Sequence, residues 1–131
     1  MNIKDFAQLL SSKNTAMYNT VVISKNESVP HKLLKLDIVK ALTFLEQPFM
    51  TECRFEQGRA DIVAPLLNTI FEVLITETDS RFIKKINYYP EGFTLVKVRH
   101  LDNFNQWFRD HYSKELYDSY LSSCNVMTII D

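Results

Sequence analysis

The sequence predicts one α/β domain in which helices flank a mixed, mostly antiparallel sheet. Its 131 residues suit a single hydrophobic core, so we expect one domain over residues 1–131. Hydrophobic residues make up 46% of the chain and it has only two glycines, which excludes a linker-rich or disordered protein. Segments with helical spacing of apolar residues alternate with short β-branched segments, and this alternation predicts the α/β class.

The first half of the chain predicts a helix, a strand, a long helix and a meander. Residues 1–11 have the spacing of a short amphipathic helix, and residues 21–23 are a β-branched run typical of a strand. Ser28 and Pro30 predict the start of a helix that ends at Gln47-Pro48, with Lys35 and the other lysines facing solvent. Strands are expected at residues 49–55, 60–64 and 69–76, and their short links make them antiparallel.

The second half predicts a helix, a fourth strand and a last helix. Asp79 or Ser80 is expected to cap a helix that turns Phe82, Ile83 and Ile86 inward and stops at Tyr89-Pro90. A strand follows at residues 93–98, and an edge strand is expected at residues 126–130. The last helix begins near Asp102 and carries an aromatic stripe typical of a core or a dimer interface. This stripe consists of Phe104, Trp107, Phe108, Tyr112, Leu116 and Tyr120.

Charge and cysteine content limit the class of protein. The net charge of −1 excludes a strongly basic nucleic-acid coat but allows a local basic groove. Cys53 and Cys124 are far apart and form neither a zinc pattern nor a disulfide framework, so we expect two buried or half-buried thiols in a reducing compartment. The N-terminus lacks a signal-peptide core and no apolar run approaches the ~20 residues of a membrane span, so we expect a cytoplasmic protein without a membrane partner.

Strand parity predicts where the side chains of the meander point. Hairpins turning about Gln57-Gly58 and Leu66-Leu67 would define two faces of the sheet. The first face is almost wholly apolar and should pack on helices; it holds Thr51, Cys53, Phe55, Ile62, Phe71, Val73 and Ile75. The second face holds Glu52, Arg54, Asp61, Val63, Ile70, Glu72 and Leu74. On that face Asp61 and Glu72 should lie opposite each other, with Cβ atoms about 5 Å apart.

Two carboxylates at that separation repel each other, so a compensating group is expected. Arg54 could provide it in a structural ion-pair cluster. The other candidate is a divalent cation, because Mg²⁺ (or Mn²⁺) is commonly held by one or two carboxylates together with water and phosphate oxygens. Glu72 favours the cation, since a carboxylate in the middle of the most hydrophobic strand is costly unless it is paired or metal-bound.

At these residues the sequence resembles the PD-(D/E)xK restriction-endonuclease-like superfamily, and within it small archaeal and archaeal-virus proteins of the nuclease and Holliday-junction-resolvase kind. The resemblance covers about residues 30–99 and implies a core of helix, three-strand antiparallel meander, helix and strand, with extra N- and C-terminal helices. It places the acid of the second strand on Asp61 and the acid of the D/E-x-K motif on Glu72. Glu52 resembles an additional carboxylate of some members, and Asp37 is a weaker match to a helix acid.

The chain departs from this motif at the lysine, because Leu74 stands two residues after Glu72. Some members of the superfamily carry the lysine on the following helix, where this chain has Lys84 and Lys85. The resemblance implies a Mg²⁺-dependent deoxyribonuclease in which Asp61 and Glu72 bind the metal, with Glu52 as a third ligand. Arg54, Arg59, Arg81 and Lys97 are the residues expected to meet DNA.

Two other functions fit the same residues. The missing lysine and the near-neutral charge favour a catalytically inactive protein of nuclease fold that binds DNA or serves as a structural or assembly protein, for instance of a virus, in the virion or its host cell. The aromatic last helix would then suit a homodimer. In the third interpretation the chain is an interaction module and the carboxylate face is solvated sheet. The three histidines, His31, His100 and His111, show no ligand spacing and are expected at the surface or at helix caps.

Overall fold

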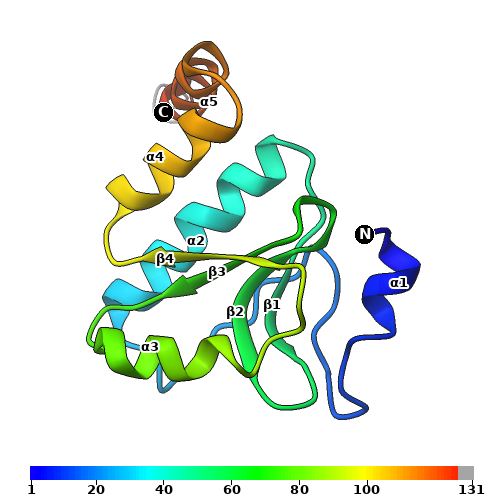
Figure 1. The fold of residues 1–131 in the computed structure, drawn as a ribbon. Helices are drawn as coiled ribbons and strands as arrows, with labels where there is room; N and C mark the ends of the chain where they lie inside the picture. Colours follow the sequence, from blue (N-terminus) through cyan, green and yellow to red (C-terminus); the bar gives the residue numbers. More distant parts are fainter. Residues whose placement is uncertain (127–131) are drawn as a thin grey trace.

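The computed structural model describes residues 1–126 and contains a four-stranded mixed sheet with the order β1-β2-β3-β4 (Figure 1). The strands are β1 (Met50–Arg54), β2 (Arg59–Ala64), β3 (Thr69–Val73) and β4 (Thr94–Val98). β1, β2 and β3 form an antiparallel meander, and β4 is parallel to β3. The α/β class and the mostly antiparallel sheet predicted from the sequence are confirmed.

Helix α2 (Val29–Phe44) covers one face of the sheet and begins where the sequence predicts. The Ser28 side chain accepts a hydrogen bond from the His31 backbone N–H, at 3.3 Å, and Pro30 lies in the first turn. Ile38 and Leu42 of α2 are fully buried against Ile62 and Phe71 of the sheet in the main core. Because α2 is fixed at its start by this cap and along its length by the core, its first two turns have a defined position beside β1 and β2.

The aromatic C-terminal segment folds as two helices instead of one. α4 (Leu101–His111) and α5 (Lys114–Val126) are separated at Tyr112, whose φ of −122° and ψ of −109° are not helical. Most aromatic side chains of the segment are buried in the chain's own core, at Phe104, Trp107, Phe108, Tyr117 and Tyr120. Dimerisation through this segment stays a prediction and would need residues other than these. Val126 ends α5, and the rest of the edge strand expected at residues 126–130 lies outside the described residues.

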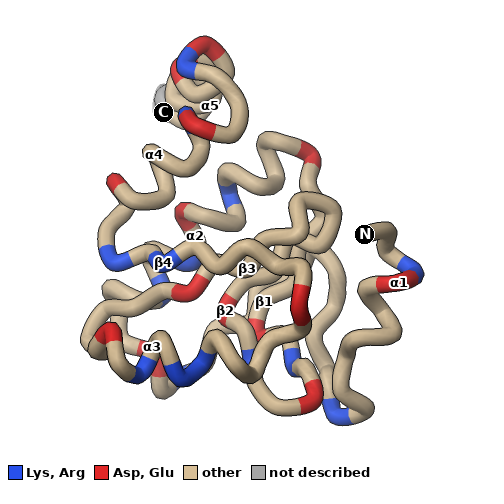
Figure 2. The backbone as a smooth tube through the Cα atoms, viewed as in Figure 1, with Lys and Arg blue, Asp and Glu red and all other residues tan. Residues whose placement is uncertain are grey.

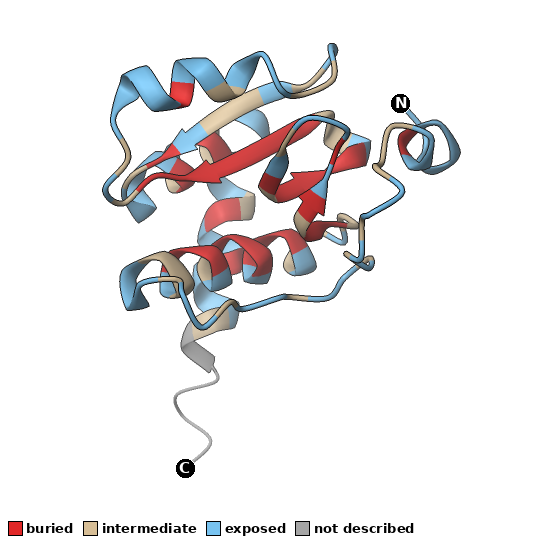
Figure 3. Cartoon of the chain, turned by 90° about the horizontal axis from the view of Figure 1, so that it is seen from below, coloured by how far each residue is buried: buried red, intermediate tan, exposed pale blue. Residues whose placement is uncertain are grey.

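The opposite face of the sheet is covered by the N-terminal segment and by the chain that follows α3. α1 (Ile3–Ala7) is shorter than the helix expected over residues 1–11, and its Phe6 is fully buried against Phe55 and Phe93. A single turn of 3-10 helix, η1 (Pro65–Leu67), joins β2 to β3. Figure 3 shows that the buried residues are concentrated in the central strands and on the side of α2 that packs against the sheet.

Helix α3 (Asp79–Ile86) makes the crossover from β3 to β4, and three expectations about it are wrong. Thr78 caps it in place of Asp79 or Ser80, and the helix ends at Ile86, three residues before Tyr89. Ile83 and Ile86 are 61% and 41% exposed, and only Phe82 is buried. Phe82 is therefore the residue that packs the helix inward, and ion pairs from Asp79, described below, attach its start to Lys97 and Arg99.

The facing of β1 also differs from the parity prediction. Cys53 and Phe55 pack in the second core with Val63 and Ile70, on the face opposite to Ile62 and Phe71. The reason is the backbone at Glu52, whose φ of +52° turns the strand over between Thr51 and Cys53. Parity counting assumes regular extended residues, so a single left-handed residue reverses the facing of everything beyond it.

The expected strand at residues 21–23 does not form. That segment is irregular and is held by a side chain, because the Val22 backbone N–H donates to Thr51 Oγ1 at 2.8 Å. Thr51 Oγ1 in turn lies 3.1 Å from the Thr20 carbonyl, to which it donates. The segment therefore runs beside β1 without a backbone ladder and leads into α2.

Both cysteines are free thiols, as expected. Cys53 is buried and Cys124 is half-buried. Burial raises the pKa of the Cys53 thiol to about 12, so this sulfur is an apolar core group at neutral pH.

No helix in the described part of the chain combines the length and the apolar character that a bilayer crossing requires.

Candidate functional site

Three acidic residues lie side by side across the meander. The pairs Thr51↔Ile62 and Cys53↔Ala60 bracket Glu52 and Asp61, so these two acids face each other across β1 and β2. The pair Ile62↔Phe71, continued by one step, sets Asp61 opposite Glu72 on β3. The register therefore brings Asp61 and Glu72 close together, as predicted, but the sheet does not present them on one face: His31 of α2 reaches Asp61 from one side and Tyr89 reaches Glu72 from the other.

Asp61 and Glu72 interact directly and differ in protonation. Burial would raise the pKa of Asp61, but contacts with His31 and Glu72 and the Val73 backbone N–H, which donates to Asp61 Oδ2 at 2.8 Å, outweigh burial and lower it. Glu72 is only 1% exposed, and burial followed by the neighbouring Asp61 charge raises its pKa well above the ordinary value. At neutral pH the arrangement favours an ionised Asp61 next to a protonated Glu72.

Tyr89, in the chain that follows α3, covers Glu72 from the solvent side. Its hydroxyl donates to Glu72 Oε1 and also lies 3.2 Å from the Arg59 carbonyl oxygen. Burial and the proximity of Glu72 raise the pKa of Tyr89, so the phenol keeps its proton. Glu72 Oε2 is buried and has no hydrogen-bond partner among the described residues. One oxygen of the Glu72 carboxyl group is thus bound by the tyrosine, and no N–H or O–H group of the described residues donates to the other.

The tip of the β1–β2 hairpin holds the Tyr88-Tyr89 segment in place through Gly58. A Cβ built at Gly58 would lie 2.9 Å from the Tyr88 Cβ, which is closer than carbon atoms pack. We expect Gly58→Ala to push this segment outward, to weaken the Tyr89–Glu72 hydrogen bond and to lower the unfolding free energy by about 1–3 kcal/mol. Urea unfolding would measure the change, with Gln57→Ala on the same exposed turn as the control; equal stability of the two variants would contradict the close contact.

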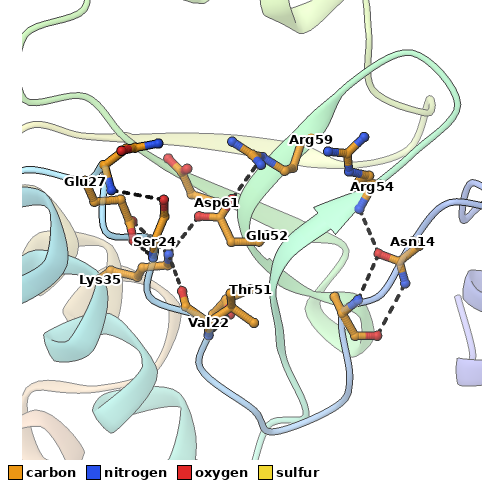
Figure 4. A network of polar contacts seen from close by, with 12 residues as sticks. Asn14, Val22, Ser24, Glu27, Lys35, Thr51, Glu52, Arg54, Arg59 and Asp61 are labelled. Carbon is orange, nitrogen blue, oxygen red and sulfur yellow. Dashed lines mark hydrogen bonds and ion pairs between the residues drawn. The ribbon is translucent and has the colours of Figure 1, made fainter.

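Glu52 is held on both of its oxygens by basic residues. Lys35 Nζ lies 2.8 Å from Glu52 Oε1, and Arg59 Nε lies 2.9 Å from Glu52 Oε2 (Figure 4). Lys35 is fully buried and also donates to Glu27 Oε1 at 2.8 Å and to the Val22 carbonyl at 2.7 Å. All three ammonium hydrogens therefore have acceptors.

The expectation that Lys35 faces solvent is wrong, and the reason is visible in the helical spacing. Lys35 lies one turn before Ile38 and Val39, both of which are buried, so it belongs to the inner side of α2. A lysine can be buried there because two carboxylates and a carbonyl replace its hydration. These compensating groups are distant in the sequence, so the charge of Lys35, taken alone, predicted that its side chain would be exposed.

His31 connects α2 to the carboxylate pair, which the sequence did not indicate. Its Nδ1 lies 2.7 Å from Glu27 Oε1 and its Nε2 lies 3.6 Å from Asp61 Oδ2. The contact with Asp61 raises the pKa of His31 against the opposing effect of burial. Burial would raise the pKa of Glu27, but hydrogen bonds from Lys35 and from the Ser24 backbone outweigh it and lower that pKa. An imidazole with one nitrogen on Glu27 and the other on Asp61 favours the protonated form.

The other residues expected at the site occupy different places. Lys85 is half-buried with its Nζ 2.9 Å from Glu77 Oε1, and the charges of Glu77, Glu72 and Asp61 raise its pKa despite burial, whereas Lys84 on the same helix is exposed. Asp37 lines a small hollow against α4 and α5, away from the carboxylate pair.

The expected DNA-contacting residues divide into paired and unpaired groups. Lys97 Nζ lies 3.0 Å from Asp79 Oδ1, and Arg99, from the same basic stretch, reaches the same oxygen at 2.8 Å. These contacts lower the pKa of Asp79, with the Arg99 hydrogen bond as the largest cause, and they attach the start of α3 to β4. Arg54 and Arg81 are exposed and have no acidic partner within residues 1–126.

A divalent cation is the ligand that two adjacent carboxyl groups would bind. The Asp61–Glu72 pair suits a cation because it offers a carboxyl oxygen that accepts no hydrogen bond from the described residues. In the described residues no three acidic, histidine or cysteine side chains are arranged as a ready metal cluster. Mg²⁺ needs only one or two protein carboxylates, with water and phosphate completing its shell. Glu72 Oε2 accepts no hydrogen bond from the described residues and belongs to the carboxyl group beside the ionised Asp61, so it would be a ligand atom of the required kind once a cation displaces the proton of Glu72.

Comparison of the chain with protein-family models, with curated proteins and with solved structures gave no match.

Proposed function

We propose that this protein is a metal-dependent nuclease-like protein that hydrolyses DNA phosphodiester bonds at the Asp61–Glu72 pair. The observation that carries the proposal is the pair itself: two carboxyl groups in direct contact, one ionised and one with a buried oxygen that lacks a partner. A buried acid pair of this kind is costly for stability, and such costs are typical of functional sites.

The strand order supports the finer fold assignment. A helix, an antiparallel three-strand meander, a crossover helix and a parallel fourth strand occur in the order α2, β1, β2, β3, α3 and β4. This is the arrangement implied by the resemblance to the restriction-endonuclease-like superfamily over residues 30–99. It places one acid near the start of the second strand and the other in the third strand.

Asp61 and Glu72 are the residues that would hold Mg²⁺ or Mn²⁺, which would supply charge neutralisation and water activation at a phosphodiester. Both oxygens of Glu52 are engaged by Lys35 and Arg59, so we leave Glu52, expected from the sequence as a third ligand, outside the proposed metal ligands. Lys85 is the better substitute for the motif lysine, because the charges of Glu72 and Asp61 raise its pKa, whereas Lys84 is exposed.

Cleavage of plasmid and branched DNA tests this proposal. We expect nicking or cleavage with Mg²⁺ or Mn²⁺, none with EDTA, and a loss of at least roughly 100-fold in rate for Asp61→Asn and for Glu72→Gln. Asp118→Asn and Glu115→Gln, both exposed on α5, are matched controls that should keep full activity. Activity that survives in both site variants would overturn the assignment of the pair.

A second function, DNA binding without cleavage, is favoured by Leu74 and Tyr89. Leu74 is fully buried at the position of the motif lysine, and Tyr89 occupies one oxygen of Glu72. Salt-sensitive DNA binding by wild-type protein that never cleaves, with either metal, would select this function. A Tyr89→Phe variant that gains cleavage would instead show that the tyrosine restrains an active site.

A further inference from the structure

We infer that the DNA taken by this protein is single-stranded, with Tyr88 as a base-stacking surface between two cationic hollows. This inference rests on the proposed function, whose carboxylate pair is covered by Tyr89, the residue that follows Tyr88. It adds the form of the substrate and a residue for its recognition.

The first hollow lies at the β1–β2 hairpin and has a volume of about 530 Å³. Three basic side chains line it, Lys13, Arg54 and Arg59. Lys13 and Arg54 have no acidic partner within residues 1–126, so their charges are available to a phosphate. Glu56 also lines the hollow, which leaves it net positive.

The second hollow lies along α3 and has a volume of about 330 Å³. Arg81, Lys84 and Lys85 line it together with Glu77 and Tyr88. Lys85 is paired with Glu77, but the two other cations are exposed and unpaired in the described part of the chain. The lining of this hollow therefore also has a net positive charge, and both hollows are open to solvent.

The two hollows meet at Tyr88, next to the carboxylate pair. Gly58 lines the first hollow and lies against the Tyr88 side chain, which lines the second. The following residue, Tyr89, contacts the Arg59 carbonyl and Glu72. Figure 2 shows lysines and arginines along α3 and, on the same side of the molecule, at the β1–β2 hairpin and the loop after α1. A nucleic-acid backbone that contacts both hollows passes over Tyr88 and the pair.

Two features favour a single strand over a duplex. Tyr88 is 46% exposed, and an exposed aromatic face between phosphate-binding cations stacks unpaired bases, which a duplex does not offer. The carboxylate pair is buried, with Glu72 1% exposed and covered by Tyr89 and the Asp61 side chain 19% exposed. A phosphate must leave a regular helix to approach such a pair, which a flexible single strand permits and a stiff duplex resists.

The test is binding of fluorescent oligonucleotides in EDTA, measured by anisotropy. Metal-free conditions separate binding from cleavage, so failure of the proposed nuclease activity does not affect the result. We expect oligo(dT) to bind at least about tenfold tighter than a duplex of equal length, and raising salt from 50 to 200 mM to weaken binding strongly. Tyr88→Ala should weaken oligo(dT) binding about tenfold, while Tyr88→Phe, which keeps the stacking face, should bind nearly as wild type.

Substitutions of basic residues test where the oligonucleotide binds. Arg54→Ala and Lys84→Ala, one from each hollow, should each weaken binding and reduce its salt dependence, whereas Lys40→Ala on the exposed side of α2 should not. Equal affinity for duplex and single strand, or a Tyr88→Ala variant that binds as wild type, overturns the inference even if the protein proves to be a nuclease. Loss of cleavage in the Asp61 and Glu72 variants with single-strand binding retained supports it.

Discussion

Replacing Lys35 by methionine should lower the unfolding free energy by about 3–5 kcal/mol, the largest effect expected for a single residue of the network. The substitution keeps most of the side-chain volume in α2 but removes the ammonium group that three acceptors share. Glu27 and Glu52 side chains are only 10% and 13% exposed, so both would lose a partner without gaining much water. Urea unfolding followed by circular dichroism would measure the loss.

Two comparisons separate charge from packing in this experiment. Lys40→Met lies on the exposed side of the same helix and should change stability by no more than about 0.5 kcal/mol. Combining Lys35→Met with Glu52→Gln should recover part of the loss, because the amide needs no counter-charge. A Lys35→Met variant as stable as wild type would show that the buried ion pairs contribute nothing to folding.

The Glu72→Gln variant should be more stable than wild type in mildly alkaline solution and should lose much of the pH dependence of unfolding. Glu72 has a pKa raised above its unfolded value, so its contribution to stability is complete below about pH 4.5 and falls as pH rises through the folded pKa. The slope reaches at most about 1.4 kcal/mol per pH unit for this one proton. A neutral amide at position 72 has no proton to lose.

Asp61 and His31, the two neighbours of this site, also contribute to the pH dependence. Asp61 has a lowered pKa, so it stabilises the fold above about pH 3.8 and loses that contribution as the solution becomes more acid. His31 has a raised pKa, so its contribution is complete below about pH 6.5 and falls above it, in both proteins. Urea unfolding from pH 5 to pH 9 compares the two proteins above the range in which Asp61 titrates. Identical curves for wild type and Glu72→Gln would contradict a buried protonated Glu72.

The carboxylate pair could be predicted from the sequence because register is a short-range property here. Two tight links fix the pairing of three consecutive strands, and this register brings Asp61 close to Glu72. The same argument failed for Cys53, because alternation does not survive the left-handed backbone of Glu52. It also could not place Tyr89, which reaches Glu72 from beyond a helix.

The sequence by itself determined the α/β class, the start of α2, the three-strand meander and the meeting of two acids, all of which follow from local spacing and short links. Only the tertiary structure decided what surrounds those acids. Lys35, His31 and Tyr89 approach from segments far apart in the chain, and whether a charged or polar side chain can be buried depends on partners that no local pattern specifies. A polar side chain was therefore wrongly predicted to be exposed where a hydrogen-bond partner from a distant segment takes the place of its hydrating water.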